Sequence, residues 1–492
     1  MKNPLIEITD FSGGMTLNKK MGRADQFALG ASLDFSSARG YLSPGVAYVR
    51  VKADGGSNFA TTEFTHILQT IKDGNAWFFG EDTKIYYLDG ESELKEASDS
   101  DQTGVFKGAA EYKSYLLYMQ DTTLGAKNLA SAYNAGYTHN FKTGFSAADY
   151  HPIKTSANNT AYIGNGQYIA SVTDPADNGT VSLTALDLAD NWQVRCLDDF
   201  GYSYLAIGAN YVTSTYESSK CKVFLWNRSD ASWTDEIIVP ENEIKAMKYV
   251  AGYLWIWAGK SCNLYVVPDG SRKATKIWQF SREDPTAEFE VYPGAVTARG
   301  GTVHFALSGG DAVSILRYQA GGLYSFSANP EKFSLNRPWR YLDYLQDYKG
   351  VGLVNNMIYI SHESKISGSD IRTYRENIGA NELHYKDIGR YYSYKFPAPK
   401  NKRIHTEAFG VTFEPLVAGC NISLYYDGNY GDGAYIFQDF STTNAEEKIV
   451  RFKVIADSLQ LTLYIRGTNT GTNYTNRPFI KSIWVTGSLI AK

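Results

Sequence analysis

The sequence predicts an all-β protein, and three observations lead to this prediction. Strand-forming aromatic residues are abundant, since 37 Tyr, 24 Phe and 9 Trp make up 14% of 492 residues. The balance of 44 Gly against 14 Pro is typical of short strands joined by tight turns. Short apolar or alternating runs recur between Gly, Asn and Asp, and the one helical candidate is a stretch near residues 24–32.

The short runs are organised as repeated hairpins. In the first copy, residues 67–71 and 76–80 flank an Asp73-Gly74 turn, and residues 84–90 supply a further strand. The clearest copy spans residues 244–267. Looser copies include residues 115–118, 162–187, 202–226, 295–318 and 352–361. Their starts lie roughly 40 to 50 residues apart, which is the period of four-stranded propeller blades.

This period predicts a β-propeller of about seven blades over residues 61–395, after an N-terminal arm and entry segment over residues 1–60. Radial stacking buries both faces of each blade and shields the sheet edges. An irregular stack of β-sandwiches is the alternative, because no repeated WD or calcium motif marks the blades.

The composition changes after the propeller segment. Residues 396–403 hold two prolines and three cations, which indicates a solvated boundary. Five or six strongly alternating strands follow, and they predict a β-sandwich or jelly-roll module over residues 396–492.

The bulk properties narrow the functional classes. A formal charge of −4 argues against an extended basic surface that wraps DNA, although a channel for passing nucleic acid stays open. No apolar run approaches the ~20 residues of a membrane helix, and the first residues lack a signal-peptide core, so we expect cytoplasmic synthesis. The widely spaced Cys196, Cys221, Cys262 and Cys420 are expected to be buried free thiols rather than a disulfide framework.

Motifs for catalysis or metal binding are not found in this sequence. Gly259-Lys260-Ser261 imitates the end of a phosphate loop, but Leu254 replaces the required first Gly and the segment lies in a hairpin. Residues 427–433 have the composition of a calcium loop, but Gln438 stands where an EF-hand needs Glu, so we predict a hairpin tip. None of the seven histidines has a partner at metal-ligand spacing: His66, His139, His151, His304, His362, His384 and His405. We therefore predict no catalytic, cofactor-binding or metal-binding residues.

One adjacent carboxylate pair needs separate treatment. Asp198 and Asp199 should point to opposite faces of a strand, so we do not expect them to share one substrate. Propeller glycosidases use two carboxylates across a cavity, and sequence spacing leaves such a pair open because its members can come from different blades.

The N-terminal segment carries a more specific pattern. It reads Phe11-Ser12-Gly13-Gly14-Met15-Thr16-Leu17-Asn18, Asp25-Gln26-Phe27, Ala31-Ser32-Leu33-Asp34-Phe35 and Gly40-Tyr41-Leu42-Ser43-Pro44-Gly45. This pattern resembles the opening of tailed-bacteriophage tail nozzle and hub (tail tip) propeller proteins. The sequence departs from the family pattern at Ser32, where Asn is usual, and at Ser43, where a basic residue often precedes Pro.

The resemblance implies a structural virion protein of the tail and not an enzyme. Such a protein forms a homohexameric ring at the genome exit path and attaches portal, adaptor or fibre proteins, while genomic DNA passes without sequence-specific contact. It is synthesised in the host cytoplasm and resides in the virion, with no membrane span. The alternatives are a receptor- or glycan-binding tail protein that presents sandwich aromatics to sugars, and a propeller glycosidase. The Gly-Gly and Pro-Gly turns predict an extended arm that packs along a neighbouring subunit.

Overall fold

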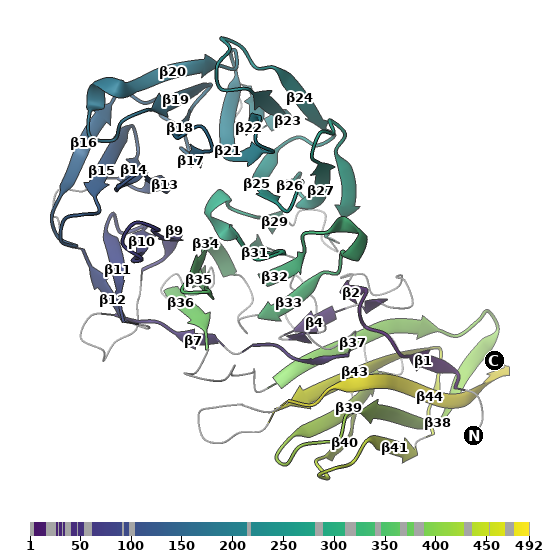
Figure 1. The fold of residues 1–492 in the computed structure, drawn as a ribbon. Coiled ribbons are helices and arrows are strands. Elements are labelled where there is room, and N and C mark those ends of the chain that lie inside the picture. Colours follow the sequence, from purple (N-terminus) through teal and green to yellow (C-terminus); the bar gives the residue numbers. More distant parts are fainter. Residues whose placement is uncertain are drawn as a thin grey trace.

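The computed structural model shows a chain built of β-strands (Figure 1). Three short 3₁₀ helices interrupt them, namely η1 (Asn178–Thr180), η2 (Pro293–Ala295) and η3 (Pro330–Lys332), and no α-helix occurs among the described residues. The structure describes residues 4–15, 26–27, 29–31, 33–34, 41–46, 48–53, 62–90, 93–97, 104–213, 218–280, 289–309, 321–339, 346–364, 371–377, 388–427, 435–451, 453–467 and 477–491.

Seven sheets of the described strands are arranged as blades around a central axis (Figure 1). Blade 1 has β9 (Phe64–Gln69), β10 (Ala76–Gly80), β11 (Ile85–Asp89) and β12 (Glu93–Glu96), with β8 (Lys52–Ala53) outside. Blade 2 has β13 (Phe106–Tyr112), β14 (Tyr115–Gln120), β15 (Thr123–Asn128) and β16 (Tyr137–Thr143). Blade 3 has β17 (Ile153–Ser156), β18 (Thr160–Asn165), β19 (Tyr168–Val172) and β20 (Val181–Asp187).

Blade 4 has β21 (Trp192–Phe200), β22 (Tyr204–Val212), β23 (Ser218–Trp226) and β24 (Asp235–Val239). Blade 5 has β25 (Ile244–Val250), β26 (Tyr253–Ala258), β27 (Asn263–Pro268) and β28 (Thr275–Trp278). Blade 6 has β29 (Phe289–Glu290), β30 (Val296–Arg299), β31 (Thr302–Gly309), β32 (Gly322–Ser327) and β33 (Asn336–Trp339). Blade 7 has β34 (Gln346–Val354), β35 (Met357–Ser364), β36 (Ile371–Glu376) and β7 (Tyr48–Arg50). The predicted propeller of about seven blades is confirmed.

The blades follow from local sequence. Second strands such as β26 are buried along most of their length because each blade is covered by a neighbour on both faces, and this explains their nearly continuous apolar runs. The hairpins depend on residues that tolerate left-handed backbone. In blade 7, Asn355 and Asn356 have φ of 49° and 60° and form the two-residue turn between β34 and β35. All four cysteines are buried and free, as predicted.

The ring closes by a strand that precedes blade 1 in sequence. β7 pairs antiparallel with β36, with Tyr48 opposite Glu376. The Tyr48 ring lies 5.4 Å from the Trp339 ring between centroids, and the Tyr48 hydroxyl contacts the buried Glu376 carboxylate at 3.5 Å. Glu376 also accepts the Ile358 N–H at 2.9 Å and pairs with Arg299 of blade 6. The segment with β7 and β8 therefore joins the last blade to the first, because β7 pairs with β36 and β8 pairs with β12. The buried ionic cluster ties blade 7 to blade 6.

Two further sheets form a module that we call the sandwich. One contains β1 (Ile6–Ile8), β44 (Ile480–Ala491), β38 (Lys402–Phe413), β41 (Glu447–Arg451) and β42 (Ile455–Ala456). The other contains β4 (Leu29–Ala31), β37 (Ile388–Pro397), β43 (Ser458–Arg466), β39 (Asn421–Asp427) and β40 (Tyr435–Phe440). Their inner faces share one core, which includes Phe409 and Val411 of β38 and Leu461 and Leu463 of β43. The boundary expected at residue 396 falls inside β37.

The helix expected near residues 24–32 is wrong for the residues described there. Leu29–Ala31 form β4, in which Gly30 lies opposite Tyr391 of β37. A short segment gains more from completing a sheet than from a weak local helical preference. Thr16–Asp25 of the N-terminal pattern lie outside the described residues.

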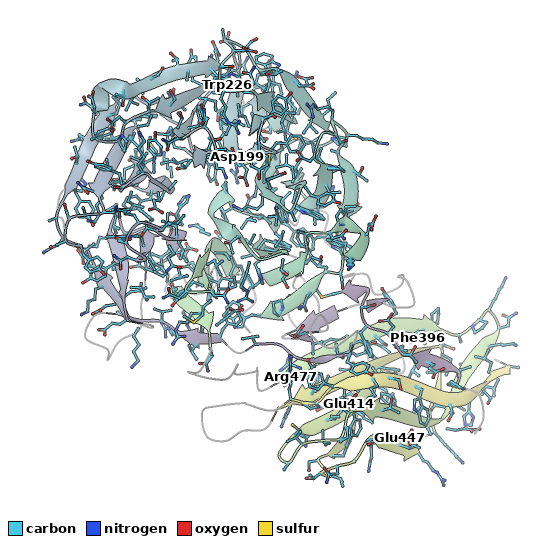
Figure 2. The ribbon with its side chains drawn as sticks, in the orientation of Figure 1. Asp199, Trp226, Phe396, Glu414, Glu447 and Arg477 are labelled. Atoms are coloured by element: carbon cyan, nitrogen blue, oxygen red, sulfur yellow. The ribbon has the colours of Figure 1, made fainter. Side chains whose placement is uncertain are left out.

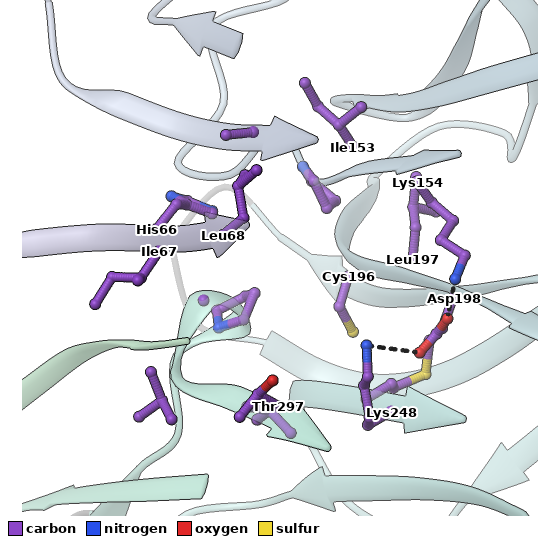
Figure 3. A pocket seen from close by; sticks show the side chains of 17 residues that line it. His66, Ile67, Leu68, Ile153, Lys154, Cys196, Leu197, Asp198, Lys248 and Thr297 are labelled. Atoms are coloured by element: carbon purple, nitrogen blue, oxygen red, sulfur yellow. Dashed lines mark hydrogen bonds and ion pairs between the residues drawn. The ribbon is translucent and has the colours of Figure 1, made fainter. Parts of the chain in front are cut away.

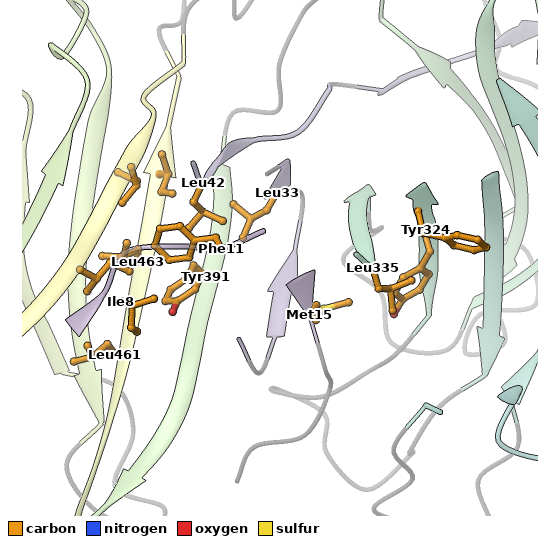
Figure 4. Packing of buried hydrophobic residues seen from close by; sticks show 14 of the residues in the cluster. Ile8, Phe11, Met15, Leu33, Leu42, Tyr324, Leu335, Tyr391, Leu461 and Leu463 are labelled. Atoms are coloured by element: carbon orange, nitrogen blue, oxygen red, sulfur yellow. The ribbon is translucent and has the colours of Figure 1, made fainter. Parts of the chain in front are cut away.

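The N-terminal arm joins the sandwich to the propeller (Figure 4). The buried Phe11 packs edge-on against Tyr391 of the sandwich, with ring centroids 5.5 Å apart. β2 (Gly14–Met15) pairs with β3 (Gln26–Phe27), and the Met15 N–H donates to the Leu335 carbonyl beside blade 6 at 3.1 Å. These residues belong to one apolar core that continues from the sandwich into blades 5 and 6. The described arm therefore packs within its own chain. Packing of the arm along a neighbouring subunit stays a prediction.

The remaining arm residues lock the same junction. β5 (Leu33–Asp34) pairs with β6 (Ser43–Pro44), and Arg477 contacts the Asp34 carboxylate at 3.1 Å. A Cβ on Gly45 would lie 2.6 Å from the Pro338 carbonyl oxygen, so a side chain does not fit there without movement. Figure 2 shows Arg477 and Phe396 on the propeller side of the sandwich, and Glu447 farther away.

We predict that Tyr48→Ala weakens ring closure. Loss of a buried aromatic side chain should lower the free energy of unfolding by about 3 kcal/mol. Urea denaturation measures this change. Tyr202→Ala, at a side chain that is 93% exposed, is the control and should shift stability by less than about 0.5 kcal/mol. Equal effects of the two variants would contradict the role of Tyr48.

We also predict that His304 makes the fold sensitive to acid. Burial, with a contribution from Arg299, lowers the pKa of His304 to about 3 from an ordinary value of 6.5. Between these values the unfolded chain binds a proton that the folded chain does not, so stability falls as pH falls below 6.5. His304→Leu should reduce the stability difference between pH 6.5 and 4.5 by about 2 kcal/mol. Denaturant titrations at both pH values test this, and an unchanged difference would refute it.

Candidate functional site: the central channel

The inner strands of all seven blades surround a cavity of ≈250 Å³ (Figure 3). Its polar lining consists of His66, Lys154, Asp198, Lys248 and Thr297, and the remaining lining is mainly apolar. A second cavity of ≈150 Å³ shares His66 with the first and is lined by further polar groups, including Tyr150, Tyr292 and Lys349. We call the two cavities together the channel.

Asp198 connects three blades at the channel wall (Figure 3). Its carboxylate contacts Lys154 Nζ of blade 3 at 2.7 Å and Lys248 Nζ of blade 5 at 3.8 Å. It also accepts the Tyr249 N–H at 2.8 Å. Burial alone would raise the pKa of Asp198, but the two lysines and this hydrogen bond hold the pKa below its usual value.

Asp199 contacts one of the side chains that also contact Asp198. Lys154 Nζ lies 3.3 Å from Asp199, and Arg228 donates to the same carboxylate at 2.7 Å. The Ser156 hydroxyl donates to Asp199 at 2.5 Å. Asp198 also reaches Lys248 of blade 5, whereas Asp199 reaches Ser156 of blade 3 and Arg228 of its own blade. That the two carboxylates do not share one substrate stays a prediction.

A second ionic cluster links blades 4, 5 and 6. Glu290 of β29 accepts hydrogen bonds from Arg195 and from Lys245, each at 2.5 Å. The Arg195 guanidinium also lies 3.7 Å from the centroid of the Tyr150 ring, which precedes blade 3. Burial lowers the pKa of Lys245, but Glu290 outweighs burial and raises it.

A third cluster joins blade 7 to blades 1 and 6. Lys349 Nζ contacts Glu63 at 2.9 Å and Glu81 at 2.5 Å, and both glutamates flank strands of blade 1. Burial raises the pKa of the Glu63 carboxyl above its usual value. The Tyr292 hydroxyl donates to Asp347 of β34 at 2.9 Å. The three clusters form what we call the polar collar.

The acidic groups of the channel are divided between its two cavities, because Glu81 and Asp149 line the smaller one. Among the described lining residues of the larger cavity, Asp198 is the one carboxylate, and two lysines contact it. Glycoside hydrolysis needs one carboxyl group that donates a proton and a second that acts on the opposite side of the sugar. Cations that already neutralise Asp198 oppose proton donation because they stabilise the charged form.

The other residues considered from sequence lie elsewhere. Lys260 and Ser261 follow β26 in a hairpin, as predicted. Residues 428–433 of the calcium-like segment and His384 lie outside the described residues. His151 Nδ1 contacts the Gly164 carbonyl at 2.7 Å, and His139 Nδ1 contacts the Tyr118 hydroxyl at 2.8 Å. The described part of the chain contains no group of three His, Cys, Asp or Glu residues that could hold a metal.

Sequence reasoning missed most of the polar collar. Its members come from different blades, so no local spacing connects Lys154, Glu290 and Lys349. One signal of the polar collar was present in the sequence, namely a charged residue at the start of an apolar strand. Lys245 follows Ile244 in this way, and it is buried in the structure.

No described helix is long and apolar enough to cross a lipid bilayer.

We predict that Asp198→Asn destabilises the propeller, since it leaves Lys154 and Lys248 near each other without the carboxylate that neutralises both. The free energy of unfolding should fall by about 3 kcal/mol. Asp187→Asn, at an exposed residue that ends β20, is the matched control and should change stability little. Urea denaturation of both variants tests this, and equal stabilities would contradict it.

Comparison with solved structures finds β-propellers among distant structural neighbours. A catalytically inactive virginiamycin B lyase from Staphylococcus aureus with quinupristin is 11% identical, with a TM-score of 0.47 over 68% of this chain and 99% of the lyase. The β-propeller domain of Cps50 (Swd1) from Myceliophteria thermophila is 9% identical, with a TM-score of 0.46 over 68% and 100%. The computationally designed Ika8 protein is 10% identical, with a TM-score of 0.40 over 70% and 96%. No family model and no curated protein matches the sequence. The β-propeller fold is assigned from the seven radial sheets of this chain.

Proposed function

We propose that this chain is a structural protein of a tailed-bacteriophage tail, a nozzle or hub subunit that assembles into a ring at the genome exit path. In this role it attaches other tail proteins, and the expected assembly is a homohexamer. It acts mechanically, as a scaffold, and carries out no reaction.

The N-terminal pattern is the observation that carries this proposal. Its described residues Phe11, Met15, Asp34 and Gly45 all lie at the junction between sandwich and propeller. A pattern that resembles nozzle and hub proteins is therefore also the segment on which the two-module arrangement depends. This supports a shared architecture, because residues with such packing roles cannot change freely.

The polar collar supports the same proposal in physical terms. A ring subunit that withstands the passage of a genome needs blades that do not slide apart. Ionic contacts between neighbouring blades, such as Lys349 with Glu81 and Lys245 with Glu290, resist that motion. Buried pairs hold their geometry because breaking one leaves an uncompensated charge.

Assembly state and location test the proposal. Analytical ultracentrifugation of the full chain should give a species of about 328 kDa, as six chains of 54.7 kDa require, and negative-stain images should show rings. An antibody against the chain should label one end of the tail on purified particles of the phage that encodes it. A monomer at all concentrations, together with absence from the particles, would refute a structural role in the virion.

A further inference from the structure

The outer face of one sandwich sheet has an unusual composition. Residues that lie side by side across β41, β38 and β44 form three successive rows on this face. The first row contains Glu447, Thr412 and Ser482, and the third contains Arg451, Ala408 and Thr486. The middle row contains Ile449, Gly410 and Trp484, and Glu7 of the neighbouring strand β1 lies next to Trp484. An apolar strip therefore crosses a face that is otherwise polar.

Trp484 lies over Gly410 on this face. A Cβ built on Gly410 would lie 2.1 Å from both Cε2 and Cζ2 of the indole, so the ring occupies the space above the glycine. The opposite inner face of the same strands carries the buried Phe409, Val411 and Ile483. Trp484 is thus held outside the core, partly exposed, and beside it Ile449 is 45% exposed.

Polar side chains flank the row that contains the indole. The indole lies over β38, so β41 with Glu447 and Arg451 is the adjacent strand, ~4.8 Å away, and alternate residues along a strand are ~6.8 Å apart. Glu7, Glu447 and Arg451 are exposed, and Thr412 and Ser482 bond to each other through their hydroxyls. An apolar ring with such a polar rim complements a molecule that has an apolar face and hydroxyl groups at its edge.

The size of the apolar strip shows whether a protein partner or a small ligand fits it better. A stable protein interface buries ~800 Å² per partner through about 20–30 residues, whereas this strip has two apolar side chains between polar rows. The surface formed by one aromatic ring and its hydrogen-bonding neighbours instead matches the size of a single sugar ring. We propose that the outer face around Trp484 binds a pyranose unit of a glycan, which stacks on the indole while Glu7, Glu447 and Arg451 bind its hydroxyls. This site is independent of the tail role proposed above.

Native gels that contain soluble dextran, mannan or xylan test the proposal with the full chain. At least one polysaccharide should slow migration of the protein, and Trp484→Ala should weaken this binding at least tenfold. Trp484→Phe keeps a smaller ring and should lose less. Glu447→Ala changes an exposed rim residue without altering the core and should weaken binding about threefold.

Tyr202→Ala is the matched control, because it removes an exposed aromatic ring from the propeller and should leave retardation unchanged. The proposal fails if none of the three polysaccharides retards the protein, or if Trp484→Ala is retarded as strongly as the unmodified chain. It also fails if Trp484→Ala instead lowers the assembly mass in ultracentrifugation, since the face would then be a contact between subunits. The ring proposal stands or falls separately, on the mass of the unmodified chain.

Discussion

The pairing of β7 with β36 is the interaction on which the rest of the architecture depends. Seven blades enclose a channel only when the last blade meets the first, and β7 is only three residues long. Backbone pairing of that length is weak by itself. The buried contacts of Tyr48 with Trp339 and Glu376, and of Glu376 with Arg299, therefore help to hold β7 on blade 7 and against blade 6. These contacts place blades 6 and 7 and the arm in one cluster.

The path of the chain explains why the sandwich and the propeller form one continuous body. The chain starts in the sandwich with β1 and β4, supplies β7 to blade 7, builds the propeller, and returns to the sandwich at β37. The propeller is thus an insertion within the sandwich. Phe11 and Met15 fill the seam between them, and the polar collar ties the inner strands from within. Both features favour a stiff scaffold.

The sequence alone was sufficient to predict structural features that depend on neighbouring residues. Hairpins such as β25 to β26, with left-handed Ala251 and Gly252, follow from turn residues between apolar runs, and their period leads to the propeller. Features that join distant segments were not accessible. Leu29–Ala31 belong to a stretch predicted as helix, and they form a strand because β37 offers an edge for pairing. The common contact of Asp198 and Asp199 is made by Lys154, which comes from another blade. Trp484 shows its position over Gly410 only after the register of β38 and β44 is known.

The pairing of β1 with β44 has a consequence for biosynthesis. Ile6 lies opposite Val485, so the earliest strand leaves the ribosome long before its partner exists. At about 5–20 residues per second, the delay is roughly half a minute to a minute and a half. During translation β1 carries apolar side chains and an unpaired edge, which is a hazard for aggregation. The first sandwich sheet can therefore be completed only after nearly the whole chain has been synthesised.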